Sequence, residues 1–290
     1  MAGSQNGRAN GPLMRGVVLA IALASVALAC LLPASPAGAS QARILAPSFV
    51  AIDATTGGVI MGRNASFRRP IASLTKVMTG LIVIERGSLQ QRVVVTPRAV
   101  AVEDYREGLV VGRAYKRITL LWSSLLTSAN DSATALAIDG GGGSLDRFYA
   151  VMNARARSLG MLDTTYASAA GLEDLTNLST ALDQARLARF ALRNPLFARI
   201  VSTRSYRTRW SAPTYAKVWV NHNKMLSWAP GTYGVKTGWT TRAGGCLVIA
   251  QRRGDRSVIA VVLGSPSIWT DMATLLDRAF ARQPASSAAP

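Results

Sequence analysis

Strand-like segments stand at both ends of the main body of the chain, and this arrangement constrains the fold more than any other feature. Short apolar stretches at 48–53 and 58–63 form one pair, and stretches at 246–251 and 257–263 form another. Each pair is joined by a short glycine-containing connection, which is typical of a β-hairpin. Helical spacing dominates between the two pairs, so an alternating parallel sheet is excluded. We expect an antiparallel sheet assembled from both ends of the chain, with a helical cluster inserted in the middle.

Apolar residues recur at helical spacing in five segments. Glycines end the first two: Gly87 follows one, and the run at 140–143 follows the next. Ser144 and Ser179 stand where the N-caps of the third and fourth would lie. The predicted helices span 74–85, 119–138, 145–159, 180–192 and 268–280.

The N-terminal segment differs in kind from the rest. Arg8 and Arg15 precede an apolar run at 16–32, and small residues follow it up to Ala39. This is the three-part layout of a secretory signal at 1–39, cleaved after Ala39. An uncleaved N-terminal anchor is the alternative, because the run is close to the length that spans a bilayer. Either way, we expect an exported protein in the periplasm or the cell-wall space.

The remainder has the composition of one folded domain. An apolar share of 49% is ample for a core, so we expect a domain over 40–283 and a disordered Ala/Ser/Pro tail at 284–290. The remainder keeps 31 of the 33 basic and all 15 acidic residues, a net charge of +16 against +18 for the whole sequence, and most of the basic residues are arginines scattered singly along the chain. This pattern excludes nucleic acid and favours an anionic cell envelope as partner. Only Cys246 remains after cleavage, so no intramolecular disulfide is expected.

Ser73 and Lys76 form the first element of a candidate site, within the tetrapeptide SLTK at 73–76. They lie at the start of a predicted helix, where a spacing of three places a hydroxyl and an amine on one face. A serine needs a base to become a nucleophile, and a lysine shielded from water can be neutral. Alone, the pattern also fits an N-cap serine with a surface lysine.

Two further elements complete the pattern. Ser128 and Asn130 flank one alanine in the central apolar region, and Lys236, Thr237 and Gly238 precede the C-terminal hairpin. The trio S-x-x-K, S-x-N and K-T-G is associated with penicillin-binding proteins and, with a central aspartate in the second element, with class A β-lactamases. The three elements fall at a helix start, an inter-helix turn and a strand.

The chain resembles the low-molecular-mass D-alanyl-D-alanine carboxypeptidase family of penicillin-binding proteins, over about 46–281. The family's fold is β-lactamase/transpeptidase-like, an α+β fold with a five-stranded antiparallel sheet, helices on both faces and the site between sheet and helical cluster. The resemblance implies peptidoglycan stem peptides as substrate, β-lactam antibiotics as inhibitors, and neither a metal nor an organic cofactor. The stretches that carry it are RPIASLTKVMT at 69–79, TSAND at 127–131, NHN at 221–223 and GVKTGWT at 234–240.

The resemblance also implies roles for the matching residues. Ser73 would attack the carbonyl carbon between two D-alanines after Lys76 takes its proton, and Ser128 would pass a proton to the leaving amine. In the same family pattern, Asn130 binds the substrate amide, Lys236 keeps the local field positive, and Thr237 and Lys236 meet the terminal carboxylate. Backbone N–H groups of Ser73 and Trp239 would form the oxyanion hole. The full set of site residues is Ser73, Lys76, Ser128, Asn130, His222, Lys236, Thr237, Gly238 and Trp239.

Four alternatives stay open. A Ser-His-Asp triad through His222, the single histidine, lacks a recognisable nucleophile elbow. Glu173 with Asn177 resembles the element with which class A β-lactamases release the acyl-enzyme, although SAN lacks their central aspartate. A D,D-endopeptidase acting on cross-links would use the same acylation machinery. A non-catalytic penicillin-binding or envelope-binding module would rest on the basic charge alone.

Overall fold

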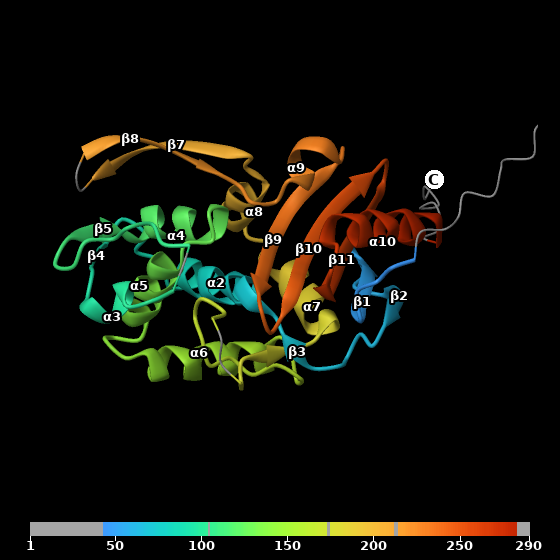
Figure 1. Cartoon of the computed structure of the whole chain (residues 1–290), viewed down its shortest axis with the longest axis horizontal. Helices are drawn as coiled ribbons and strands as arrows, with labels where there is room; N and C mark the ends of the chain where they lie inside the picture. The colour runs from blue at the N-terminus through green and yellow to red at the C-terminus, as the bar shows by residue number, and fades with distance from the viewer. Residues whose placement is uncertain (1–42, 104, 173–174, 212–213, 283–290) are drawn as a thin grey trace, which may run out of the picture. The chain divides into compact units, whose positions relative to one another are not determined.

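A five-stranded antiparallel sheet lies beside a helical cluster in the computed structural model (Figure 1), which describes residues 43–103, 105–172, 175–211 and 214–282. The predicted signal segment and tail lie outside the described residues. The strand order is β2-β1-β11-β10-β9, and β1 pairs with β11, so both ends of the domain meet in one sheet as predicted. The strands are β1 (Ser48–Asp53), β2 (Val59–Arg63), β9 (Thr232–Thr240), β10 (Gly244–Arg253) and β11 (Arg256–Ser265).

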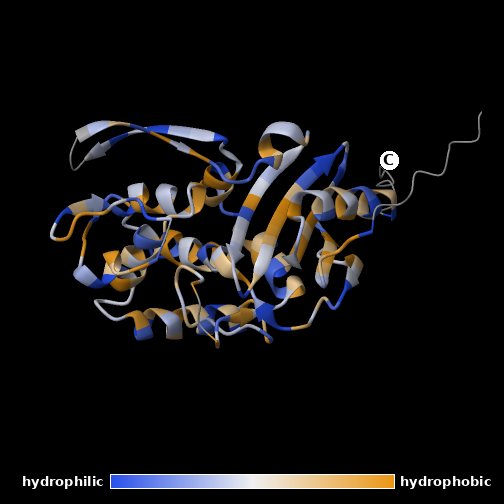
Figure 2. Ribbon diagram, viewed as in Figure 1, coloured by the Kyte–Doolittle hydropathy of each residue, from blue (hydrophilic) through white to orange (hydrophobic). Residues whose placement is uncertain are grey.

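Both faces of the sheet are covered, which explains why its strands read as nearly continuous apolar runs. Side chains alternate across a strand. Along β11, Val258 and Val262 share one buried cluster with the C-terminal helix α10 (Ile268–Arg282). Ile259 and Val261 belong to the other cluster, which includes the helices. Figure 2 shows the apolar character of the central strands.

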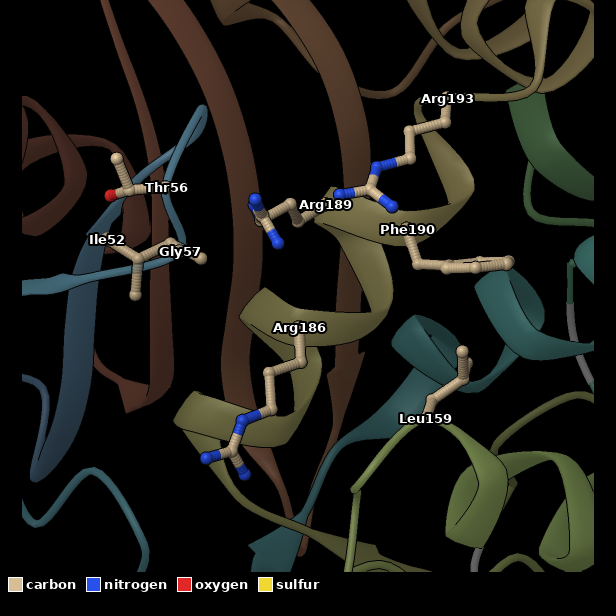
Figure 3. A pocket seen from close by; sticks show the side chains of 8 residues that line it. All are labelled: Ile52, Thr56, Gly57, Leu159, Arg186, Arg189, Phe190 and Arg193. Carbon is tan, nitrogen blue, oxygen red and sulfur yellow. The ribbon is translucent and has the colours of Figure 1, made fainter.

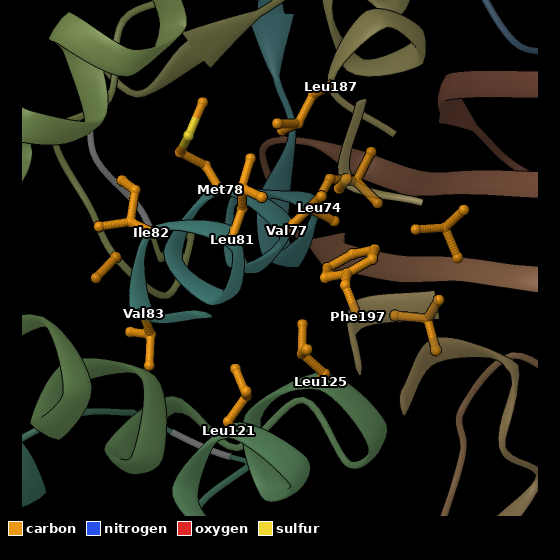
Figure 4. Close-up of a cluster of buried hydrophobic side chains, with 14 of the residues drawn as sticks. Leu74, Val77, Met78, Leu81, Ile82, Val83, Leu121, Leu125, Leu187 and Phe197 are labelled. Carbon is orange, nitrogen blue, oxygen red and sulfur yellow. The ribbon is translucent and has the colours of Figure 1, made fainter. Parts of the chain in front are cut away.

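Helix α2 (Lys76–Arg86) passes through the middle of the core, and each of its residues from Lys76 to Ile84 is buried. Leu121 and Leu125 pack on one side of it, while Leu187 and Phe197 come from two other helices (Figure 4). A helix buried all round carries its first residue into the core as well. This is how a lysine at the start of α2 becomes inaccessible to water.

The helical cluster and three small strand pairs lie between the N-terminal hairpin and β9. The helices are η1 (Ala72–Thr75), α3 (Pro97–Val100), α4 (Arg117–Leu126), α5 (Asn130–Gly140), α6 (Leu145–Ser158), α7 (Ala181–Ala191), α8 (Pro195–Ser202) and α9 (Met225–Trp228). The strand pairs are β3 (Arg69–Pro70) with β6 (Leu178–Ser179), β4 (Arg92–Val94) with β5 (Ala114–Lys116), and β7 (Ser205–Ser211) with β8 (Thr214–Val220).

The prediction of one helix over 119–138 is wrong, because the segment is divided into α4 and α5. Ser128 lies in the turn between them with φ = +62°, a conformation that breaks a right-handed helix and is uncommon for residues other than glycine. The Thr127 hydroxyl donates to the Ser123 carbonyl at 2.8 Å and closes the last turn of α4. The break presents Ser128 at a bend instead of along a helix face.

The N-cap of α7 is Thr180, one residue later than the predicted Ser179. The Thr180 hydroxyl accepts from the Asp183 N–H at 3.0 Å, as an N-cap does. Ser179 belongs to β6, and its hydroxyl lies 2.7 Å from that of Thr164. At α6 the predicted N-cap is confirmed, since Ser144 accepts from the Arg147 N–H at 3.3 Å.

The β7–β8 hairpin was not expected from the sequence. It runs beside α4 (Figure 1), and Tyr206 stacks on Trp122 with 4.0 Å between ring centroids. Trp210 and Trp219 are buried on the same side. Among the described residues, no helix combines the length and the apolar character needed to cross a bilayer.

Candidate active site

Ser73 lies in the single turn η1, directly before the buried helix α2. The residue before it, Ala72, has φ = +48°, a strained conformation of the kind that clusters at functional sites. The Lys76 amine donates to the Ser73 hydroxyl oxygen at 2.7 Å. The structure therefore brings together the predicted nucleophile and its predicted base in direct hydrogen-bond contact.

The Lys76 amine is enclosed by acceptors and has no exposed surface. It donates to the side-chain oxygen of Asn130 at 2.7 Å and to the Ala170 carbonyl at 2.6 Å. Burial lowers the pKa of Lys76 well below its usual value, and the nearby Lys236 charge lowers it further, against a smaller opposite effect of Asp131. A neutral amine in this position can accept the proton of a hydroxyl.

The loop of residues 168–172 packs against the Ser73–Lys76 pair. At Gly171 the backbone has φ = +81°, and a β-carbon there would lie 1.8 Å from the Ala72 carbonyl oxygen. The Gly171 N–H donates to the Ser168 hydroxyl at 2.9 Å. Only glycine permits this approach, which places the Ala170 carbonyl against the Lys76 amine.

The second predicted element lies on the other side of this pair. Ser128 is buried in the turn before α5 and lines the same cleft as Ser73. Asn130 begins α5, and its side-chain amide donates to the Glu103 carbonyl at 3.3 Å. Its amide thus connects Lys76 with Glu103, close in sequence to the loop at 105–109.

That loop is fixed by two buried carboxylates. Asp131 accepts from the N–H groups of residues 107–109 at 2.8 to 3.1 Å. Glu107 accepts from the Ser123 hydroxyl at 2.7 Å and the Trp219 indole at 3.1 Å, and it forms an ion pair with Lys217. The loop is therefore tied to α5, α4 and β8 together.

Strand β9 supplies the third predicted element. Lys236 is buried, and this burial lowers its pKa to about 7; its amine donates to the Thr237 carbonyl at 3.0 Å. Thr237, Gly238 and Trp239 line the cleft with Ser73. A β-carbon at Gly238 would lie 2.9 Å from the Ser73 backbone nitrogen, so the missing side chain lets the strand run directly past the nucleophile.

His222 reaches the cleft from the segment before α9. Burial lowers its pKa to about 4, and Lys236 and Lys76 add to this effect by charge repulsion. The flanking asparagines have structural contacts: the Asn221 side chain donates to the Thr203 carbonyl at 3.0 Å, and that of Asn223 to the Gly234 carbonyl at 3.0 Å. They hold a neutral imidazole at the edge of the site.

The structure thus brings all nine predicted site residues to one place, and it adds residues that sequence reasoning missed. Tyr105 lines the cleft on both sides of Ser73, is 66% exposed, and has its ring 5.9 Å from that of His222. No periodic pattern marks its loop, so the sequence carried no signal for it. Ile268 and Trp269 at the start of α10 form the far wall. Glu173 lies outside the described residues.

Within the described ranges, no cluster of three or more histidine, cysteine, aspartate or glutamate side chains is arranged to hold a metal ion. The chemistry available in the cleft is that of a serine hydroxyl, two amines with lowered pKa, a second hydroxyl and an amide. This set can transfer an acyl group to Ser73.

Comparisons with known proteins give a consistent picture. A family model described as D-alanyl-D-alanine carboxypeptidase matches residues 35–267. The chain is 33% identical over 250 residues to D-alanyl-D-alanine carboxypeptidase DacB2 of Mycobacterium tuberculosis, covering 83% of this chain and 84% of that protein. It is 31% identical over 270 residues to D-alanyl-D-alanine endopeptidase of Escherichia coli, covering 87% and 85%. The crystal structure of the Streptomyces K15 DD-transpeptidase superposes with a TM-score of 0.78 at 31% identity, covering 83% of this chain and 99% of that one.

Proposed function

The chain belongs to the D-alanyl-D-alanine carboxypeptidase family of serine hydrolases, and we propose that Ser73 is the nucleophile with which it removes the terminal D-alanine of a peptidoglycan stem. One observation carries this assignment: the 2.7 Å contact between the Ser73 hydroxyl and a fully buried Lys76 amine of lowered pKa. A charged surface lysine could not serve as the base, because it would hold its proton at neutral pH.

The acylation step follows from these positions. Neutral Lys76 takes the Ser73 proton while the oxygen attacks the carbonyl carbon between the two D-alanines. The backbone N–H groups of Ser73 and Trp239 receive the oxyanion, a type of contact worth roughly 3–4 kcal/mol per donor. The carbon–nitrogen bond breaks as Ser128 delivers its proton to the leaving amine and takes up the proton that Lys76 removed from Ser73, and free D-alanine departs.

Substrate orientation comes from the cleft walls. Thr237 and protonated Lys236 meet the terminal carboxylate, with neutral His222 at the same edge, and Asn130 binds the amide of the stem. A contact of this charge-assisted kind selects a free C-terminus. Water then hydrolyses the ester on Ser73, and a penicillin that acylates the same oxygen without rapid hydrolysis would inhibit the enzyme.

Replacing Ser73 tests the nucleophile. Ser73→Ala is expected to abolish covalent labelling by a fluorescent penicillin and release of D-alanine, while circular dichroism stays unchanged. Ser202→Ala, at an exposed serine ending α8, is the matched control and should label normally. Persistent labelling of Ser73→Ala would exclude Ser73 as nucleophile.

A D,D-endopeptidase is the second candidate, because relatives named D-alanyl-D-alanine endopeptidase match at 31% and 32% identity. A pentapeptide stem and a cross-linked dimer should be assayed side by side. Faster D-alanine release from the pentapeptide supports the carboxypeptidase, and faster cleavage of the dimer supports the endopeptidase. A short-lived penicilloyl adduct that becomes long-lived in Glu173→Gln would instead indicate a β-lactamase.

We place the enzyme outside the cytoplasmic membrane, in the periplasm or the cell-wall space, with its net charge of +18 favouring contact with an anionic envelope. N-terminal sequencing of the mature protein should begin at Ser40 if residues 1–39 are a cleaved signal. An intact N-terminus in the membrane fraction would support the uncleaved anchor.

A further inference from the structure

A second cavity, of about 270 Å³, lies between α7 and the turn that joins β1 to β2 (Figure 3). None of its lining residues also lines the cleft around Ser73. Three arginines dominate it, Arg186 and Arg189 from α7 and Arg193 from the connection after α7, and no carboxylate residue lines it. The lining consists of Ile52, Thr56, Gly57, Leu159, Arg186, Arg189, Phe190 and Arg193.

Arg189 is held in place by backbone oxygens. Its guanidinium donates through Nε to the Ala54 carbonyl at 3.0 Å and through Nη2 to the Thr55 carbonyl. The same guanidinium lies where a side chain of residue 57 would begin, with Nη1 3.2 Å from the position of a β-carbon on Gly57. These contacts fix the position of the Arg189 guanidinium. Because both acceptors are neutral carbonyl groups, they do not neutralise its positive charge.

The other two arginines add charge around it. Arg186 donates to Asp183 at 3.0 Å, so its charge is partly balanced. Neither Arg189 nor Arg193 forms an ion pair with any carboxylate in the part of the chain that the structure describes. In Figure 3 the Arg193 guanidinium is turned back along α7 toward Arg189. Two cations without a countercharge in one cavity repel each other, and an anion bound between them removes this repulsion.

We propose that this cavity binds the phosphate group of a soluble phosphate ester, with Arg189 and Arg193 as its main contacts and Arg186 at the rim. Guanidinium groups match phosphate oxygens in a fork geometry. A carboxylate offers two oxygens in one plane, whereas a tetrahedral phosphate can accept from guanidinium groups that are not coplanar. The apolar side chains of Leu159 and Phe190 accommodate a small organic substituent on the phosphate. This site is independent of the proposed function.

The experiment measures binding of glycerol 3-phosphate to the whole chain by titration calorimetry at about 50 mM salt, where screening is weak. Arg189 is kept, because its loss would release the turn at 54–57. The test variant is Arg186→Gln/Arg193→Gln, and the matched control is Arg207→Gln/Arg209→Gln, which removes the same charge from exposed positions of β7. Acetate and vesicles of phosphatidylglycerol are the comparison ligands.

We expect the test variant to lose at least tenfold in affinity for glycerol 3-phosphate, the control to stay within twofold, and penicillin labelling to be unchanged in both. Absence of binding to the unmodified chain would overturn the proposal. An equal loss in both variants would attribute binding to total charge instead of this cavity. Acetate binding as tightly as the phosphate, or binding to vesicles alone, would overturn the assignment of a soluble phosphate ester.

Discussion

At the scale of single residues, the cleft is distinguished by two buried lysines, Lys76 and Lys236. Burial is the main cause of the lowered pKa of Lys76 and of Lys236, and Lys236 adds charge repulsion to Lys76. Burying both amines in one site favours loss of at least one proton near neutral pH. Lys76 is in direct contact with the Ser73 hydroxyl, so its neutral amine is the one positioned to accept the hydroxyl proton.

A first prediction tests the neutral form of Lys76. Lys76→Arg keeps a cation that does not lose its proton in proteins, so we expect acylation by a fluorescent penicillin to slow by roughly 10²- to 10⁴-fold, the usual contribution of a general base. Lys224→Arg, at an exposed position, should leave the rate unchanged. In the unmodified enzyme the rate should rise with pH as Lys76 loses its proton. Acylation by Lys76→Arg at the unmodified rate would contradict the role of Lys76 as base.

A second prediction concerns stability. Because the pKa of Lys236 falls from 10.5 to about 7 on folding, the unfolded chain binds more protons between these values, and the free energy of unfolding rises with pH in that window. Below about pH 7 the full destabilisation is present, on the order of a few kcal/mol. Lys236→Met should therefore be more stable than the unmodified protein near pH 6, with the advantage shrinking toward pH 10.

Urea denaturation at several pH values measures this difference. The exposed Lys224→Met variant serves as the control and should follow the unmodified protein. Parallel curves for Lys236→Met and the unmodified protein would show that the Lys236 amine keeps its ordinary pKa after folding.

At the scale of elements, the loop at 105–109 links the cleft with the β7–β8 hairpin, which contributes none of the predicted site residues. Asp131 holds its backbone, and Glu107 ties it to Ser123 on α4 and to Trp219 on β8. Burial opposes the charge on Lys217, but the hydrogen bond and charge of Glu107 dominate and raise its pKa. The hairpin therefore fixes the loop from which the Tyr105 ring reaches the site, close in sequence to the Glu103 carbonyl.

A third prediction follows for Glu107→Gln. The amide leaves Lys217 without its countercharge and turns a donor toward the groups that Glu107 accepted from, so we expect a loss of about 1–3 kcal/mol in the free energy of unfolding. Penicillin acylation should slow as well, because Asn130 loses a fixed partner. Glu85→Gln, which breaks the more exposed pair with Arg155, should cost less than about 1 kcal/mol. Equal losses in the two variants would contradict the special position of Glu107.

The sequence predicted the elements whose residue pattern is local. The two hairpins that build the sheet, the helix after Ser73 and the helix 268–280 all follow from apolar spacing. The turn at Ser128 was expected from the motif alone; apolar spacing predicted one helix over 119–138, because no glycine or proline marks the residue whose positive φ breaks the helix. The β7–β8 hairpin was missed although polar and aromatic residues alternate along β7, the pattern of a half-buried strand; its Tyr206 ring packs on Trp122 of α4 only in the assembled fold.

For the site, the motif residues were predictable because each lies within a short recognisable pattern. Their environment was not, since the Ala170 carbonyl, the Tyr105 ring and the position of His222 depend on loops packed from distant parts of the chain. The lowered pKa of Lys76 likewise arises from the burial of α2 on all sides. Burial of that kind can be read only from the assembled fold.

At the scale of the whole molecule, the same core cluster joins the sheet to the helices. It contains Val248 and Val261 of the sheet together with Leu74, Leu121 and Phe197. The three motif segments attach to this cluster from η1 and α2, from the α4–α5 turn, and from β9. Sheet and helical cluster therefore share one hydrophobic interior, with the cleft at its edge.

A fourth prediction is that the region over 43–282 unfolds in one transition. Loss of penicillin labelling and loss of far-ultraviolet circular dichroism should have the same midpoint in urea, since coincident probes mark cooperative unfolding. Labelling that disappears at clearly lower urea than the helical signal would show that the cleft opens separately from the core.

The pairing of β1 with β11 also means that the sheet stays incomplete until β11 is present. Every motif residue from Ser73 to Trp239 is made before β11 (Arg256–Ser265), yet β1 has no partner on that side until β11 emerges. Without β11, Val50 and Ile52 would lie on an open strand edge of the kind that aggregates. A product that stops short of β11 contains every motif residue and lacks the strand that joins β1 to β10. The three motifs alone therefore do not complete the sheet that contains β9; β11 is required for that.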